Sequence, residues 1–246
     1  MLNDKVAIVT GGAAGIGEAI VRQLVMDGAK VVIADFDADR AHSLADNVGR
    51  DVARAFHVDV TNADAVRNAV AFTVAEFGAL HLAVNNAGVG VPTTPIVDLR
   101  VEDWRRVIDI DLTSVFYSLK YEIPAIIAAG GGAIVNMSSI LGVAGVAGSA
   151  AYVAAKHGVV GLTKSAALEY AAHGIRVNAV GPGYVATAMI EKEMTEAERA
   201  EIVGLHPLGR IGKPGEIAAL TSFLLSEKAS FITGAYYPAD GGYLAQ

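Results

Sequence analysis

The sequence contains no cysteine, which excludes disulfide bonds and thiolate chemistry. This absence is compatible with a reducing compartment, and we expect a cytoplasmic protein. Long hydrophobic runs are missing as well, since no apolar stretch reaches the roughly 18 residues of a membrane-spanning helix. The first residues, MLNDKVAIVT, place charges before an apolar run of only strand length, which is not typical of a signal peptide.

Basic residues are few. Lysine and arginine number 19 against 26 aspartates and glutamates, and the net charge of −7 argues against a broad nucleic-acid surface. The six histidines show no spacing typical of metal ligands, so we expect no metal site, and a catalytic zinc is disfavoured. The expected partner is a small molecule, with neither nucleic acid nor membrane.

Hydrophobic residues, by contrast, make up 53% of the 246 residues. Such an excess without a membrane segment indicates a parallel sheet covered on both faces, or apolar helix faces buried between subunits. A chain of this length is compatible with a single domain.

Strand-like and helix-like segments alternate along the whole chain. Strands are predicted at residues 5–10, 30–34, 53–58, 81–84, 133–137, 175–180 and 235–238. The order predicts an α/β fold of the Rossmann type: a doubly wound parallel sheet with helices on both faces, in one domain spanning residues 1–246. The chemically interesting residues follow strand ends, which is the ligand-binding edge of such a sheet.

The first strand runs into a glycine-rich turn. Gly11-Gly12-Ala13-Ala14-Gly15-Ile16-Gly17 follows Thr10, and a helical pattern then continues to Gly28. Glycines at such a turn let the backbone approach phosphate groups, and the helix N-terminus faces their negative charge. The segment therefore predicts a dinucleotide-binding site, with the spacing TGxxxGxG rather than GxGxxG.

Two acidic residues stand at the ends of the next strands. Asp35 lies 24 residues after Gly11, where a carboxylate accepts hydrogen bonds from the ribose hydroxyls of NAD and repels the extra phosphate of NADP. NAD is therefore the expected cofactor, although Asp35 can also serve as a helix N-cap. Asp59 is expected from its position to contact adenine. Thr61 and Asp64 resemble a capping box for the following helix.

Tyr152 and Lys156 stand four residues apart in a predicted helix, so the phenol and the ammonium lie on one face. An ammonium close to a phenol stabilises the phenolate, and such a pair can exchange protons with a substrate. An isolated pair of this kind is more often plain helix surface. Ser138 and Ser139 end the strand before this helix, and Ser149 is expected to be the helix N-cap.

Two other polar positions each allow two interpretations. Asn85 and Asn86, at the end of the fourth strand, either form a plain turn or hold the backbone against a cofactor ring. Asp111 interrupts a long apolar helical stretch, and it is either a residue on a solvated face or a buried functional carboxylate.

These motifs resemble the short-chain dehydrogenase/reductase family over essentially the whole chain. The resemblance is carried, in the family's order, by Thr10-Gly11-x-x-x-Gly15-Ile16-Gly17, Asp59-Val60, Asn85-Asn86-Ala87-Gly88, Ser139 with twelve residues before Tyr152, Tyr152-x-x-x-Lys156, Pro182-Gly183, Ile232-Thr233-Gly234 and Asp240-Gly241-Gly242.

The resemblance implies a role for each matching residue. Tyr152 would donate or accept the proton of the substrate oxygen, Ser139 would hold that oxygen, and Lys156 would assist Tyr152 and bind the nicotinamide ribose. Ser139 is preferred to Ser138 because its separation from Tyr152 matches the family's. The implied cofactor contacts are Gly11, Gly15, Ile16 and Gly17 for the phosphates, Asp35 and Asn86 on the adenosine side, Asp59 and Val60 for adenine, and Val185 and Thr187 for the carboxamide. Tyr152 and Lys156 complete this set.

At Asp111 the chain departs from the family, which often has Asn there in a segment like VNLTGVF. In the family that Asn supports a water molecule that passes protons between the lysine and solvent. An Asp can hold the same water, and its charge would also stabilise the Lys156 ammonium. We therefore expect Asp111 to keep the relay role as a fourth catalytic residue.

The expected reaction is hydride transfer between NAD and a neutral, largely apolar secondary alcohol or ketone, with Tyr152 as general acid and base. The loop at residues 140–151 carries no charge, and candidate pocket walls are Leu141, Val143, Val146, Tyr184 and Met189. A substrate lid is expected at about 184–208. Lys192, Arg199 or His206 in this lid would serve the alternative of an acidic substrate.

Two other functions compete with this prediction. An NADPH-dependent 3-oxoacyl carrier-protein reductase is disfavoured by Asp35, and a non-catalytic NAD-binding regulatory protein by the complete set of Ser139, Tyr152 and Lys156. The family resemblance further implies a homotetramer, for which the apolar helices around Val115 and Val159 are candidate interfaces.

Overall fold

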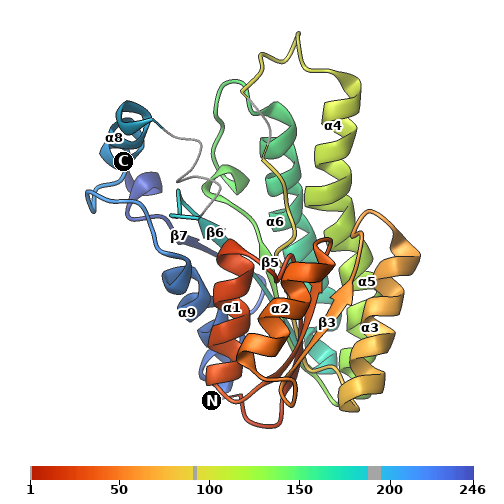
Figure 1. Cartoon of the computed structure of the whole chain (residues 1–246). Helices are drawn as coiled ribbons and strands as arrows, with labels where there is room; N and C mark the ends of the chain where they lie inside the picture. The colour runs from red at the N-terminus through yellow and green to blue at the C-terminus, as the bar shows by residue number, and fades with distance from the viewer. Residues whose placement is uncertain (1, 91–92, 188–194) are drawn as a thin grey trace.

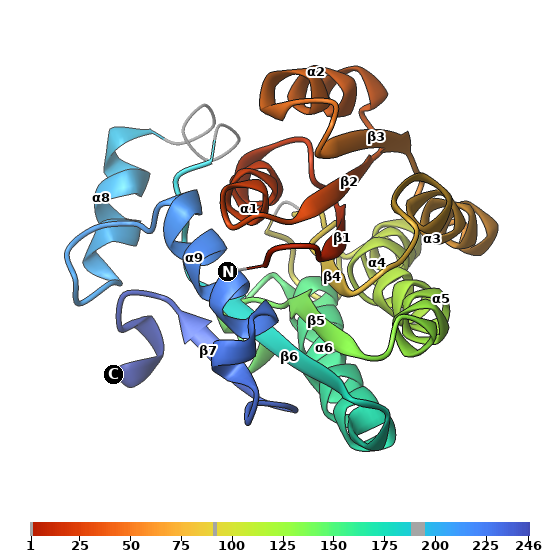
Figure 2. The same ribbon diagram turned by 90° about the horizontal axis from the view of Figure 1, so that it is seen from below.

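The computed structural model describes residues 2–90, 93–187 and 195–246. Its strands form one sheet with helices around it (Figure 1). The strand order is β3-β2-β1-β4-β5-β6-β7, as Figure 2 shows, and every neighbouring pair is parallel. The strands are β1 (Val6–Thr10), β2 (Lys30–Asp35), β3 (Ala53–His57), β4 (Leu82–Asn85), β5 (Gly132–Met137), β6 (Ile175–Pro182) and β7 (Tyr236–Ala239). The predicted doubly wound parallel sheet is confirmed.

Helices cover both faces of the sheet (Figure 2). One face carries α1 (Gly15–Met26), α2 (Ala38–Val48) and α9 (Pro214–Leu225), and the other carries α3 (Ala63–Phe77), α5 (Ser114–Ala128) and α6 (Ala150–Tyr170). Two further helices of the described residues are α4 (Val101–Ile108), which leads into α5, and α8 (Glu196–Gly204). The strand order reverses direction at β1 and β4, which opens a crevice at the carboxyl edge.

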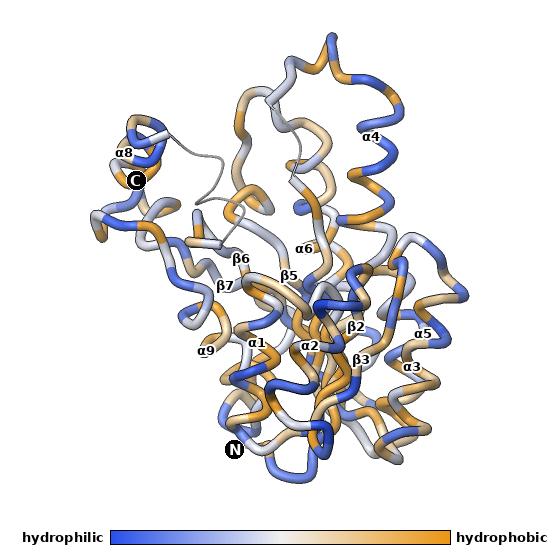
Figure 3. The backbone as a smooth tube through the Cα atoms, in the orientation of Figure 1, coloured by the Kyte–Doolittle hydropathy of each residue, from blue (hydrophilic) through white to orange (hydrophobic). Residues whose placement is uncertain are grey.

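Most of the described core lies in two apolar layers, one on each side of the sheet. Alternate strand residues enter opposite layers, so Val9 and Ile33 pack toward α1, whereas Ile8 and Val32 pack toward α3 and α5. The hydrophobic colouring accordingly concentrates on the central strands (Figure 3). Within the described residues, no helix is both long enough and apolar enough to cross a bilayer.

Two capping predictions need correction. The N-cap of α3 is Asn62, whose Oδ1 accepts hydrogen bonds from the amides of Asp64 and Ala65, so the Thr61–Asp64 capping box is wrong. The Thr61 hydroxyl donates instead to the Asp59 carboxylate, at 2.7 Å. Asn62 takes the cap because it has the extended backbone directly before the helix. Ser149 is the N-cap of α6 by position, but its side chain makes no capping hydrogen bond.

A π-helical turn, Asp109–Thr113, separates α4 from α5. Such a turn changes the direction in which the following side chains point, and it often occurs at functional sites. Here it places the Asp111 carboxylate in the interior with 0% exposure. The interpretation of Asp111 as a solvated surface residue is therefore excluded.

A buried polar network joins the centre of the sheet to α5 and α6. The Asn85 side-chain amide donates to Glu122 at 3.1 Å and to Asn136 Oδ1 at 2.9 Å, and Asn136 donates to the Thr163 hydroxyl at 2.9 Å. Burial raises the pKa of Glu122 to about 7, against the hydrogen bond from Asn85, which lowers it. Within the described residues, Asn85 Oδ1 has no hydrogen-bond partner. A protonated Glu122 carboxyl can supply the missing donor.

This network predicts that the fold loses stability as the pH rises. The folded chain binds the Glu122 proton more tightly than the unfolded chain, so the contribution is fully present below pH 4.5 and is lost as the pH rises through about 7. The loss amounts to about 3 kcal/mol. Glu122→Gln should remove this pH dependence, because an amide keeps both an acceptor and a donor without titrating.

Urea denaturation at pH 5 and pH 8 measures the effect. At pH 8 Glu122→Gln should unfold at a higher urea concentration than the parent, whereas Glu196→Gln, at an exposed position, should behave like the parent. A Glu122→Gln variant with the parental difference between the two pH values would contradict the prediction.

Candidate active site

A cavity of about 740 Å³ lies at the carboxyl edge of the sheet. Its wall includes nine of the predicted cofactor-binding residues: Gly11, Gly15, Ile16, Gly17, Asp35, Asp59, Val60, Asn86 and Thr187. The other three predicted contacts, Tyr152, Lys156 and Val185, are not part of this wall. The Val185 side chain is 3% exposed and packs in the core, so only the Val185 main chain is available to a ligand.

The glycine loop fits the phosphates of a dinucleotide. Gly11 and Gly15 have φ angles of +60° and +56°, which disfavour residues with a Cβ, and a Cβ on Gly11 would lie 2.9 Å from the Ala87 backbone. The N-cap of α1 is Ala14, and no side chain caps this helix. The first amides of α1 are therefore left for an anion, as a pyrophosphate requires.

Asn86 holds the glycine loop in place. Its side-chain amide donates to the carbonyls of Gly11 at 2.9 Å and Thr10 at 3.2 Å. In return, the Thr10 hydroxyl accepts the amides of Asn86 and Ala87. Asn86 is thus more than a turn former, whereas Asn85 belongs to the buried network.

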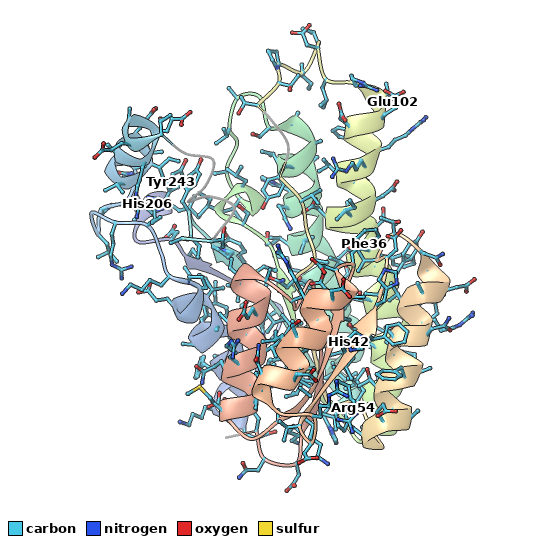
Figure 4. The ribbon with its side chains drawn as sticks, in the orientation of Figure 1. Phe36, His42, Arg54, Glu102, His206 and Tyr243 are labelled. Atoms are coloured by element: carbon cyan, nitrogen blue, oxygen red, sulfur yellow. The ribbon has the colours of Figure 1, made fainter. Side chains whose placement is uncertain are left out.

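The Asp35 carboxylate sits between the glycine loop and α2. Its oxygens accept the amides of Ala13 at 2.8 Å and Asp37 at 2.9 Å. The N-cap of α2 is Asp37, so the alternative role of Asp35 as N-cap is wrong. Phe36, labelled in Figure 4, is 71% exposed, and both Phe36 and Asp35 line the cavity. Arg40 lines the cavity too and pairs with Asp37 at 3.1 Å; no sequence motif marked it.

Tyr152 and Lys156 lie on the same side of α6. The Lys156 Nζ is 5.3 Å from the centre of the Tyr152 ring. Lys156 is only 3% exposed, and its ammonium contacts the Met137 carbonyl at 3.2 Å and the Asp111 carboxylate at 3.1 Å. The pair is therefore not plain helix surface.

The charges of this centre depend on one another. Burial alone lowers the pKa of Lys156, but the charges of Tyr152 and Asp111 outweigh it and the pKa is raised. Burial also raises the pKa of Asp111, although Lys156 opposes this effect. The Val89 amide donates to both Asp111 oxygens, and a Cβ on Gly88 would lie 2.6 Å from Asp111 Oδ1. Lys156 is thus an ammonium held by a close-fitting carboxylate.

The two serines after β5 have different hydrogen-bond partners. The Ser138 hydroxyl donates to the Lys156 carbonyl at 3.0 Å, which ties β5 to α6. The Ser139 Oγ accepts the Leu141 amide at 3.2 Å, and its own hydrogen has no acceptor in the described part of the chain. Ser139 therefore has a donor to offer a substrate, which supports its choice over Ser138.

An aromatic cluster stands beside this centre on the lid side. The Tyr184 ring packs edge-on against the His206 ring, with 5.8 Å between the ring centres, and both rings contact Tyr243. His206 and Tyr243 are labelled in Figure 4. Burial raises the pKa of Tyr184, and the nearby Tyr243, Glu201 and Tyr152 add to the rise.

His206 is not available to an acidic substrate. It is buried, its Nδ1 donates to the Ile202 carbonyl at 2.7 Å, and its Nε2 accepts the Tyr184 amide at 3.4 Å. The predicted contacts Met189 and Lys192 lie outside the described residues. Over residues 2–90, 93–187 and 195–246, no three His, Asp or Glu side chains gather in a way that could hold a metal ion.

A parallel sheet with a glycine loop shaped for phosphates, and a tyrosine beside a buried lysine, is typical of a dinucleotide-dependent enzyme. Comparison with known families narrows this class. The family model described as enoyl-(acyl carrier protein) reductase matches residues 11–244. The chain belongs to the short-chain dehydrogenase/reductase family and is an oxidoreductase of that type, and the family implies a nicotinamide cofactor, NAD or NADP.

Individual relatives match along almost their whole length. The chain is 48% identical to the cyclohexanol dehydrogenase of Acinetobacter sp. (strain SE19), covering 99% of this chain and 96% of that protein. It is 46% identical to the cis-4-hydroxycyclohexanecarboxylate dehydrogenase of Sinomonas cyclohexanicum, covering 98% and 97%. The crystal structure of gox2181 superimposes with a TM-score of 0.95 at 35% identity, covering 100% of this chain and 97% of the other.

Proposed function

We propose that the protein is an NAD-dependent dehydrogenase of neutral cyclic secondary alcohols, which it converts reversibly to ketones. The observation that carries the proposal is the buried Lys156 beside Tyr152, bonded to the carbonyl of Met137, two residues before Ser139 with its free donor. Relatives named for cyclohexanol, 4-hydroxycyclohexanecarboxylate and cyclopentanol support the cyclic substrate. Two observations support a neutral substrate. The loop at residues 140–151 carries no charge, and both ring nitrogens of His206 already have hydrogen-bond partners in the protein.

In the oxidative direction, the Ser139 hydroxyl donates to the substrate oxygen and holds it near Tyr152. The Tyr152 phenolate then removes the hydroxyl proton. Lys156 stabilises that phenolate with its charge, and Asp111 keeps the ammonium in place and acts as the relay residue. The nicotinamide ring, when bound, accepts the hydride from the carbinol carbon.

We assign the cofactor residues accordingly. The amides at the start of α1 bind the phosphates, and Asp35 accepts hydrogen bonds from the adenosine ribose, which favours NAD. We assign Asp59 and Val60, which line the cavity, to adenine, and Thr187 and the Val185 main chain to the carboxamide. The segment at about 184–208 serves as the substrate lid.

A spectrophotometric screen of NADH formation tests this function. We expect cyclohexanol and cyclopentanol to be oxidised with NAD, and 3-oxoacyl thioesters to be poor substrates for reduction with NADPH. An enzyme that reduced these thioesters with NADPH and left the cyclic alcohols unchanged would be the carrier-protein reductase instead.

Asp35→Ser tests the cofactor assignment. The substitution removes the charge that repels a ribose phosphate, so kcat/KM with NADP should rise and kcat/KM with NAD should fall, each by about tenfold. Glu18→Gln, a charge change on the exposed side of α1, serves as the control. A parent enzyme that already prefers NADP would contradict the role of Asp35.

We further propose a homotetramer in the cytoplasm. Val115 and Val159, named as candidate interface centres, are themselves buried in the core. The outward faces of the same two helices carry Phe116, Ile127 and Leu168, which are 48%, 37% and 85% exposed in the single chain. Burying these side chains against another copy would remove apolar surface from water.

A further inference from the structure

A phenol on the edge strand β7 reaches the serine of the active site. The Tyr236 hydroxyl donates a hydrogen bond of 2.8 Å to the main-chain carbonyl of Ser139. Tyr236 is paired with Ala179 of β6, whereas Ser139 follows β5, on the far side of β6. The Tyr236 side chain therefore crosses a whole strand to make this contact.

Gly181 makes the crossing possible. It stands two residues after Ala179 and so lies on the same face of β6. A Cβ at this position would lie 2.1 Å from the hydroxyl oxygen of Tyr236 and 2.3 Å from the ring carbon that bears it. The Tyr236 ring thus occupies the space that a side chain at position 181 would need.

The contact completes a set of bonds that fix Ser139. Its carbonyl also accepts the Gly142 amide at 2.8 Å, and its Oγ accepts the Leu141 amide at 3.2 Å. Ser139 has an extended backbone, with φ −165° and ψ 165°. Because the carbonyl and the Oγ of Ser139 both accept hydrogen bonds, the orientation of Ser139 is fixed before a substrate binds.

Tyr236 keeps its proton throughout the neutral range. Burial, with a smaller contribution from Asp240, raises its pKa to about 12. Asp240 is itself fixed by the amides of Gly242 and Leu244, each at 2.9 Å. Tyr236 is consequently a permanent donor to Ser139 and no proton acceptor for the substrate.

We propose that Tyr236 is a positioning residue for the reaction: its hydroxyl fixes the Ser139 main chain so that the Ser139 Oγ points at the substrate oxygen. The inference rests on the proposed function, because it takes Ser139 as the residue that holds this oxygen. Donors aimed in advance at a reacting oxygen lose much of their effect when they are displaced slightly.

Tyr236→Phe removes only the hydroxyl and tests the proposal on an alcohol that the parent enzyme has been shown to oxidise. We expect kcat to fall about tenfold, because Ser139 loses its alignment but not its hydroxyl. The KM for NAD and the melting temperature should stay close to the parental values. Tyr237→Phe is the matched control, since it makes the same change at the next residue, which packs into the opposite core layer.

Combination with Ser139→Ala gives the decisive readout. Ser139→Ala alone should lower kcat about a hundredfold, and adding Tyr236→Phe should cause no further loss, because no hydroxyl remains to be positioned. Parental kcat in Tyr236→Phe would overturn the proposal, and so would two losses that multiply in the double variant. The proposed function is decided separately, by whether the parent enzyme oxidises the alcohols at all.

Discussion

Tyr152→Phe should lower kcat for alcohol oxidation by about a thousandfold. The variant keeps the ring, its packing and its distance from Lys156, and it loses only the oxygen that exchanges a proton with the substrate. The glycine loop and Asp35 are untouched, so the Kd for NAD should stay within about threefold of the parental value. The expected result is an enzyme that binds its cofactor and does not turn over.

Steady-state measurement of NADH formation gives kcat, and calorimetric titration gives the Kd for NAD. Tyr170→Phe, near the far end of the same helix, is the control and should keep the parental kcat. Near-parental turnover in Tyr152→Phe would contradict the role of Tyr152 as general acid and base. Loss of NAD binding together with turnover would instead point to a damaged fold.

The sequence predicted best what is encoded locally. The glycine loop, the Tyr152–Lys156 pair and the position of Ser139 depend on short spacings within or next to one element, so a pattern is enough to find them. The alternation of strands and helices likewise predicted a doubly wound sheet, because each apolar strand flanked by helices needs cover on both faces.

Such patterns could not predict contacts between segments that lie far apart in the sequence. The bond from Tyr236 to Ser139 joins residues 97 positions apart, and nothing near Tyr236 in the sequence marks it. Glu122 looks like an ordinary helix residue until β4 brings Asn85 against it, with Asn136 of β5 bonded to the same Asn85 amide. The position of Asp111 depends on a π-helical turn, for which the helical period of apolar residues gives no signal.

Asp111→Ala should lower the free energy of unfolding by about 3–5 kcal/mol, because the Lys156 ammonium stays buried without its counter-charge. Asp111→Asn keeps the shape and an acceptor for the Val89 amide, so its cost should be about 1–2 kcal/mol. Urea denaturation measures both values. Asp109→Asn, an exposed acid in the same π-helical turn, is the matched control and should change little.

The pH dependence of Asp111→Asn separates a catalytic part from a structural one. Asp111 is one of the two charges that raise the pKa of Lys156. Without it the lysine loses its proton at lower pH, so the alkaline side of the pH–rate profile should move toward lower pH. If the carboxylate also passes protons toward solvent, kcat at neutral pH should fall about tenfold. If Asp111→Asn kept the parental pH–rate profile and the parental turnover, the charge of Asp111 would have no catalytic role. Asp111 would then only pack beside Lys156.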